Sequence, residues 1–191
     1  MEKYKRFILM LSIMMLCFTS VGFNNKVDAA SLPSVSAHAY VIMDSNSGEI
    51  LYSKDAYKKI YPASTAKMMT ALVAIENCDL SKKITITNTI LNSVPSIATQ
   101  ANLKAGYSYT LEELLNMLLV YSAADAANAI AFEVGGSISG FTKMMNDRAK
   151  SLGMNSTNFD NAIGLDGRSF PNTYCNAVDI ANLTKYRSEE R

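Results

Sequence analysis

The sequence predicts an α+β fold in which the strands come first and the helices follow. Two observations predict it: two alternating apolar segments flank a turn-rich stretch near residue 45, and several longer apolar runs with capping residues come after them. The chain has 191 residues, of which 49% are apolar and 18% charged, and its net charge is +1. This length and composition suit one domain and exclude a disordered chain or a strongly basic nucleic-acid-binding protein. Three cysteines exclude a disulfide scaffold, and the sequence leaves open whether Cys78 and Cys175 pair.

Residues 1–29 are predicted to be a secretory signal peptide. A basic head precedes the apolar run of residues 7–18, and small residues lead to a cleavage site after Ala29. The alternative is an uncleaved membrane anchor, for which the run is short. We therefore expect an exported domain over residues 30–191, at the outer face of the cell membrane or in the cell wall. The basic head consists of Lys3, Lys5 and Arg6.

The mature chain is expected to begin with a β-hairpin. Residues 39–43 and 49–53 alternate as strands do, and the segment Asp44–Gly48 between them has turn chemistry. Pro62 then interrupts the chain, and a helix is predicted from Ser64 to about Asn77. Because this helix is apolar almost all round, we expect it at the centre of the domain. Residues 81–109 suit short strands and loops.

Four further helices are predicted in the second half of the chain. A capping box at Thr110–Glu113 opens an apolar run that ends at Tyr121, and the chain breaks at Ser122. Helical pattern resumes at residues 125–134, returns at residues 141–152 after a cap at Ser139, and returns again after a cap at Asn176. Residues 154–175 read as a loop.

The distribution of nucleophiles and bases favours a serine–lysine pair. The single histidine, His38, leaves no material for a histidine-based triad or a multi-histidine zinc site. Ser64 and Lys67 are three residues apart at the start of the predicted helix, so both side chains lie on one face. The helix N-terminus favours a developing oxyanion, and burial near it lowers the pKa of Lys67 toward that of a useful base.

Ser64, and Ser122 at the interhelical break, each have a plain structural interpretation as well. A chain of this composition contains about one Ser-x-x-Lys pair by chance, so Ser64 could simply cap a helix with Lys67 in solvent. Ser122 could point into a cleft from an interhelical break or could only cap the helix that starts near Asp125.

Taken together, the segments resemble the serine D-alanyl-D-alanine carboxypeptidases, the low-molecular-weight penicillin-binding proteins of peptidase family S11. The resemblance covers most of the mature chain and implies a serine β-lactamase/transpeptidase-like fold, in which an antiparallel sheet is flanked by a helical lobe. The fold would be incomplete here, with the N-terminal hairpin and the helical lobe present and the C-terminal strands missing. The matching segments are residues 39–54, Tyr61–Thr70, Thr110–Ser122 and Asn161–Gly167.

The resemblance also implies a mechanism. Ser64 would be the acylated nucleophile, Lys67 its base and Ser122 the relay that passes a proton to the departing D-alanine. The backbone N–H of Ser64 would form half of the oxyanion hole. The implied substrates are peptidoglycan stem peptides ending in D-Ala-D-Ala, with β-lactams as covalent inhibitors, and neither a metal ion nor an organic cofactor is implied.

Two departures from the family pattern lead us to expect weakened activity. The family's Ser-x-Asn box ends here in Ala124, which removes a hydrogen-bonding partner on a scale of about 1–3 kcal/mol; Asn128, one turn on, could partly replace it. No Lys-Thr-Gly or Lys-Ser-Gly follows Ser122, and the strand that carries this box supplies the second oxyanion donor, worth about 10²–10³ in rate. A non-catalytic cell-wall or partner-binding remnant of the family is therefore the alternative.

A β-lactamase-like hydrolase is a third possibility. Residues 112–116 match the Glu-x-x-Leu-Asn deacylation motif of class A β-lactamases. The match precedes Ser122 instead of following it and coincides with a capped helix start, which favours the carboxypeptidase interpretation.

Overall fold

The computed structural model describes residues 1–7, 10 and 35–189, and these fall into two units, residues 1–36 and 37–191. In the first unit residues 2–7 are helical. Most of the predicted signal peptide, including the cleavage site after Ala29, lies outside the described residues. Within the described ranges, no helix is both long and apolar enough to cross a membrane.

The predicted N-terminal hairpin is confirmed. Strand β1 (Tyr40–Met43) pairs antiparallel with β2 (Ile50–Lys54), with Tyr40 opposite Lys54. The carboxylate of Asp44 closes the turn, because its Oδ1 accepts hydrogen bonds from the backbone N–H groups of Asn46 (3.1 Å) and Ser47 (2.7 Å). Local turn chemistry thus sets the hairpin register.

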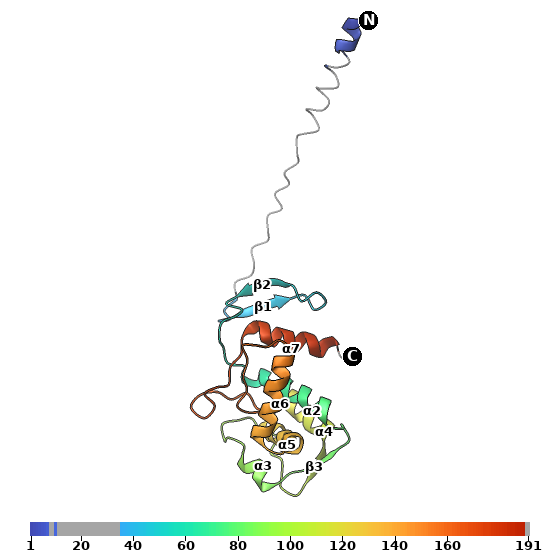
Figure 1. Cartoon of the computed structure of the whole chain (residues 1–191). Helices are drawn as coiled ribbons and strands as arrows, with labels where there is room; N and C mark the ends of the chain where they lie inside the picture. The colour runs from blue at the N-terminus through green and yellow to red at the C-terminus, as the bar shows by residue number, and fades with distance from the viewer. Residues whose placement is uncertain (8–9, 11–34, 190–191) are drawn as a thin grey trace. The chain divides into compact units, whose positions relative to one another are not determined.

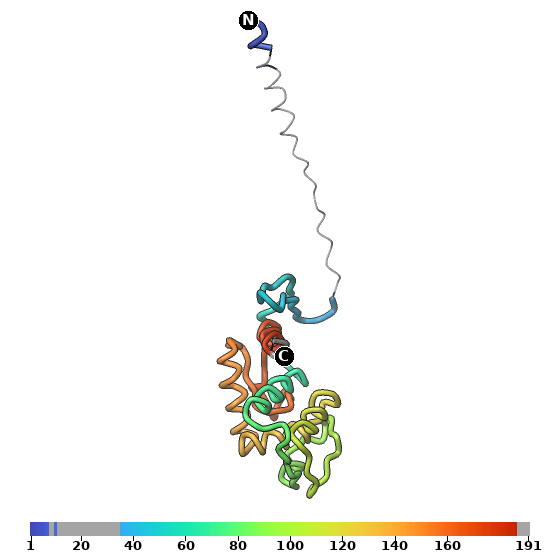
Figure 2. The backbone as a smooth tube through the Cα atoms, turned by 90° about the vertical axis from the view of Figure 1, so that its right-hand side faces the viewer, coloured from blue at the N-terminus to red at the C-terminus, as the bar shows by residue number. Residues whose placement is uncertain are grey.

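The remaining elements form a helical lobe next to the hairpin. Helix α7 (Ala177–Glu189) packs against β1 and, in both views, lies between the hairpin and the other helices (Figures 1 and 2). A second two-stranded sheet pairs β3 (Lys83–Thr85) with β4 (Ser108–Thr110). The other elements are η1 (Ala63–Ala66), α2 (Lys67–Asn77), α3 (Asn88–Asn92), α4 (Leu111–Val120), α5 (Ala124–Gly135) and α6 (Ile138–Ser151).

Helix α2 is central to the lobe, as its composition predicted. It packs against α4, α5, α6 and α7, and its residues from Met69 to Ala74 are buried. The prediction that the helix is buried on all sides fails for its last turn, where Ile75 is 41% exposed. Lys67, the first residue of this helix, is buried as well.

One predicted helix boundary is wrong, and one short helix was not predicted. The N-cap of α6 is Ser137, whose side chain accepts a hydrogen bond from the N–H of Gly140, and not Ser139. Helix α3 was not predicted, because five residues capped by Thr87 are too few to show helical periodicity. The capping box of α4, the break at Ser122 and the cap of α7 by Asn176 are confirmed. Cys78 and Cys175 are both free thiols.

Candidate active site

Ser64 lies on a tight turn that leads directly into the central helix. Pro62 precedes the 3₁₀ turn η1, and Thr65 fastens it by donating to the carbonyl of Pro62 from its backbone N–H (3.1 Å) and its hydroxyl (2.6 Å). The interpretation of Ser64 as a helix cap is therefore wrong, since neither η1 nor α2 has a side-chain cap. The N–H of Ser64 precedes the first hydrogen bond of the turn, which Thr65 donates, so it belongs to the N-terminal end that carries the partial positive charge.

Ser122 lies in the break between α4 and α5. Its backbone is in the left-handed region (φ +61°), which is uncommon for a residue with a side chain. The N-cap of α5 is Ala123, without a side-chain cap bond, so Ser122 is not the cap of that helix either. The carbonyl of Met117 accepts from the N–H groups of both Tyr121 (3.2 Å) and Ala123 (3.1 Å) and holds the turn closed around Ser122.

The structure brings the three predicted residues into mutual hydrogen-bond contact. Lys67 Nζ donates to Ser64 Oγ and to Ser122 Oγ, both at 3.1 Å, and Ser122 Oγ donates to Ser64 Oγ at 2.9 Å. The two serines are 58 residues apart in sequence. Three groups that can each gain or lose a proton thus form a closed triangle, and proton transfer around it requires no large movement.

The amine of Lys67 is shielded from water. The residue is only 6% exposed, and desolvation lowers the pKa of Lys67 below its ordinary value of 10.5. Burial penalises the ammonium form, and its two hydrogen-bond partners are neutral hydroxyls. Ser64, by contrast, is exposed. The arrangement therefore combines an exposed serine hydroxyl with an amine whose pKa is lowered, which is what nucleophilic catalysis by a serine would need.

Residues 26–190 match the peptidase S11 family, described as D-alanyl-D-alanine carboxypeptidase. The chain belongs to this family. Among relatives, it is 31% identical over 186 residues to the D-alanyl-D-alanine carboxypeptidase DacF of Bacillus subtilis and 33% identical over 162 residues to DacC of Escherichia coli. These alignments cover 94% and 80% of this chain, but only 47% and 40% of the relatives. The S11 chain thus spans about half or less of their length.

Solved structures show the same fold. The D-alanyl-D-alanine carboxypeptidase DacD from Francisella tularensis aligns with a TM-score of 0.75 and 32% identity over 83% of this chain and 38% of that one. Penicillin-binding protein 5 from Haemophilus influenzae aligns with a TM-score of 0.77 and 29% identity over 84% of this chain and 47% of that one. The predicted penicillin-binding, transpeptidase-like fold is confirmed for the hairpin and the helical lobe.

A buried carboxylate holds the loop before α4 against the Ser122 turn. Asp125 is fully buried and accepts hydrogen bonds from the N–H groups of Ala101 (2.9 Å) and Leu103 (3.0 Å), and Ala124 N–H donates to Thr99 (2.8 Å). The sequence identified Asp125 only as part of a helix start. Buried acceptors paired with backbone N–H groups of another segment fix that segment in place.

Asn128 does not replace the asparagine that Ala124 removes. Its Nδ2 donates to Ser93, at 3.2 Å to the carbonyl and 2.9 Å to the hydroxyl, on the side of α3. Ala124 itself is buried. The hydrogen bonds that Lys67 makes to side chains go to the two serines.

The Glu-x-x-Leu-Asn segment is a helix start. Glu113 forms the capping box of α4, accepting from the N–H of Thr110 (2.7 Å) while Thr110 Oγ1 accepts from the N–H of Glu113 (3.2 Å). Asn116 donates to the carbonyl of Glu112 within the same helix. These side chains serve the helix, as the carboxypeptidase interpretation predicted.

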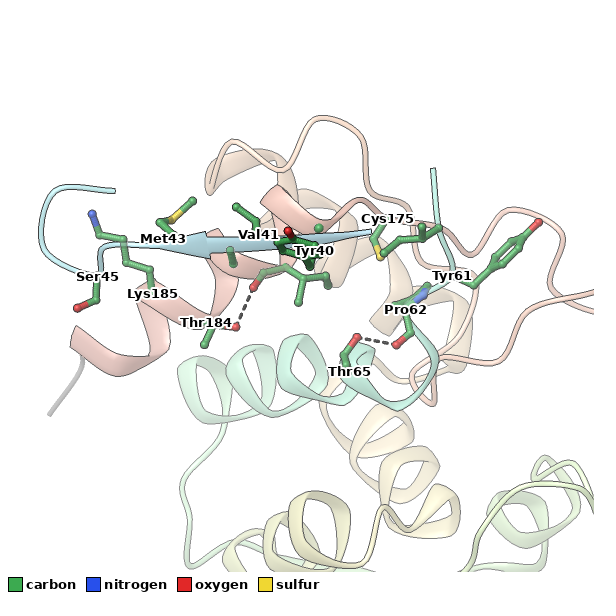
Figure 3. A pocket seen from close by; sticks show the side chains of 14 residues that line it. Tyr40, Val41, Met43, Ser45, Tyr61, Pro62, Thr65, Cys175, Thr184 and Lys185 are labelled. Carbon is green, nitrogen blue, oxygen red and sulfur yellow. Dashed lines mark hydrogen bonds between the residues drawn. The ribbon is translucent and has the colours of Figure 1, made fainter. Parts of the chain in front are cut away.

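A cavity of about 530 Å³ lies next to the turn at Pro62–Thr65, between β1 and α7 (Figure 3). Thr65 and Pro62 line it on one side, and its walls are mostly apolar. Ser64, Lys67 and Ser122 do not line it. The candidate active site is therefore the serine–lysine triangle and not this cavity.

Proposed function

We propose that this chain carries the acylating machinery of a serine D-alanyl-D-alanine carboxypeptidase. The observation that supports the proposal is the triangle of hydrogen bonds among Ser64, Lys67 and Ser122. The implied substrates are peptidoglycan stem peptides that end in D-Ala-D-Ala, in keeping with the names of the relatives.

Acylation begins with neutral Lys67. When the amine is uncharged, its lone pair accepts the proton of Ser64 Oγ while that oxygen attacks the carbonyl carbon of the penultimate D-alanine. The carbonyl oxygen becomes an oxyanion, and the N–H of Ser64 at the helix N-terminus stabilises it. The C–N bond then breaks, and the departing D-alanine nitrogen takes up one proton, which Ser122 passes on from the ammonium of Lys67.

Deacylation uses the same base. Lys67, neutral again, accepts a proton from water as the water oxygen attacks the Ser64 ester, and the proton returns to Ser64 Oγ when the shortened peptide leaves. A β-lactam enters by the same attack, which breaks the ring amide and leaves the drug as an ester of Ser64. We also propose that the domain is exported, on the basis of the basic head and apolar run at the N-terminus.

One observation favours a second candidate, a non-catalytic binding remnant of the family. Ala124 stands where the family's Ser-x-Asn box has an asparagine, so the chain lacks that hydrogen-bonding carboxamide two residues after Ser122. Such a protein would keep the fold and bind wall peptides or a partner without turning them over.

A labelled penicillin distinguishes the two candidates. The chain is incubated with the label, digested, and searched by mass spectrometry for an adduct on the peptide that contains Ser64. The proposal predicts an adduct that Ser64→Ala abolishes and that substitution of the exposed Ser139 leaves intact. A folded chain that forms no adduct would favour the binding remnant, and release of D-alanine from a model peptide measures turnover.

A further inference from the structure

We propose that the loop from Asn161 to Leu165 is a positioning brace for the nucleophile, with Gly164 as the residue that contacts the Ser64 turn. The hydrogen bonds of Ser64 Oγ and Lys67 Nζ go to one another and to Ser122 and not to this loop, so the proposed role of the loop is positioning. The test of this inference by acylation rate rests on the proposed function, whereas the test by NMR does not.

The residue before the nucleophile is held in an uncommon conformation. Ala63 has φ +47°, in the left-handed region that residues with a side chain rarely adopt. Such a conformation costs free energy and persists only where the surrounding structure enforces it. Because Ser64 follows directly, any relaxation of Ala63 changes the direction of the Ser64 side chain.

Gly164 packs against this residue more closely than any side chain would allow. A Cβ placed on Gly164 would lie 2.6 Å from the carbonyl carbon of Ala63, closer still to its carbonyl oxygen, and 3.0 Å from Cβ of Ala66. The atoms of Ala63 that it meets are backbone, so they cannot rotate away. Gly164 also has φ +83°, which glycine adopts without strain. The loop backbone is thus in direct contact with the nucleophile turn.

Asn161 gives the loop its shape. Its Oδ1 accepts hydrogen bonds from three successive N–H groups, those of Ile163 (3.1 Å), Gly164 (2.7 Å) and Leu165 (3.1 Å). Its Nδ2 donates to the carbonyl of Leu165 (2.8 Å) and to Thr173 Oγ1 (3.1 Å). Asn161 is 2% exposed, so these bonds are sheltered from competing water.

Two further side chains tie the loop to the helices. Thr70, on the nucleophile helix α2, donates from its hydroxyl to the carbonyl of Ala162 at 2.7 Å and is fully buried. Asn146 of α6 clamps Phe159, accepting from its N–H at 2.8 Å and donating to its carbonyl at 2.9 Å. The loop is therefore fixed at both α2 and α6 and transmits that fixation to Ala63 through Gly164.

The matched test compares two glycines of one loop region. Gly164→Ala and Gly167→Ala both place a side chain on a backbone with positive φ (+83° and +91°), but a Cβ at Gly167 meets nothing within 4 Å. Acylation of the chain by a labelled penicillin is followed at several concentrations to separate noncovalent binding from the acylation rate constant. We expect Gly164→Ala to lower the rate constant by about 10²-fold, the cost of an approximately 1 Å misplacement, with binding unchanged. Gly167→Ala should acylate like the parent chain.

A second pair of variants does not depend on Gly164→Ala folding. Thr70→Val removes the hydroxyl that holds Ala162 while keeping the shape of the side chain, and Thr70→Ser keeps the hydroxyl. We expect Thr70→Val to lower the acylation rate constant and Thr70→Ser to restore it. Equal acylation by Gly164→Ala and Gly167→Ala, or by Thr70→Val and the parent, would overturn the brace.

A spectroscopic readout separates failure of the brace from failure of the proposed function. If the parent chain forms no penicillin adduct, the proposed function fails, and the brace is judged from the NMR resonances of the Ala63–Ala66 amides. Shifts of these amides in Gly164→Ala but not in Gly167→Ala support the brace. Unchanged amides in Gly164→Ala refute it.

Discussion

Replacing Lys67 with methionine is expected to remove the general base and leave the fold intact. Lys67 Nζ is the group that contacts both serine hydroxyls, at 3.1 Å each. Among the described residues, the hydrogen-bond partners of those hydroxyls include no carboxylate, histidine or second lysine that could take over. A positioned general base contributes about 10²–10⁴ in rate, so Lys67→Met should slow penicillin acylation by that factor.

Two pH effects follow from the lowered pKa of Lys67. Acylation needs the neutral amine, so its rate should rise with pH along a limb centred below 10.5, and Lys67→Met should lose that limb. The unfolded chain binds the proton more tightly than the folded chain does. Stability should therefore increase as the pH rises from the folded-state pKa toward 10.5, and at pH 7 Lys67→Met should be at least as stable as the parent.

Stopped-flow acylation and urea unfolding, measured on the same samples, check these expectations. Lys143→Met is the control, because Lys143 is exposed on α6 and pairs with Asp147. Acylation by Lys67→Met at the parent rate, with the parent pH limb, would refute the assignment of the base. A large loss of stability in Lys67→Met at pH 7 would contradict the argument that the buried ammonium of Lys67 destabilises the parent chain.

Three further predictions concern the supports of the site. Asp125→Ala leaves the N–H groups of Ala101, Leu103 and Ala126 without their acceptor. At about 1–3 kcal/mol for each such loss, it should destabilise the chain by at least about 3 kcal/mol in urea unfolding, and a change below about 1 kcal/mol would contradict this. Thr110→Ala removes the capping box of α4 and should cost about 1 kcal/mol, whereas an unchanged unfolding midpoint would show that the cap is dispensable. Burial raises the pKa of the Cys175 thiol to about 12. Peptide mapping after alkylation at pH 8 should therefore find Cys175 unmodified until the chain unfolds. Rapid modification of Cys175 in the folded chain would disprove its burial.

Features with a local cause could be read from the sequence. The hairpin turn follows from the side chain of Asp44, and the start of α4 from Thr110 and Glu113, because in each case the partners are within three residues. The i, i+3 contact of Ser64 and Lys67 is local in the same way. These features depend on short-range hydrogen bonds that recur wherever the residues do.

Features that depend on distant packing could not be read. The cavity beside Thr65 and the contact of Gly164 with Ala63 are formed by segments far apart in the chain. Asn128 illustrates the same limit, since its amide could in principle have turned either to Lys67 or to Ser93, and only the position of α3 decides. The resemblance to the S11 family brought Ser64 and Ser122 together where periodicity alone could not.

An NMR titration of the Lys67 side chain tests the central claim most directly. The ε-carbon resonance is followed against pH in the folded chain and again in urea, with Lys67→Met to assign it. A folded-state midpoint below 10.5, returning to about 10.5 on unfolding, is the result that a desolvated amine between two hydroxyls requires. A folded-state midpoint at or above 10.5 would place the ammonium in a solvated environment and contradict its role as the base.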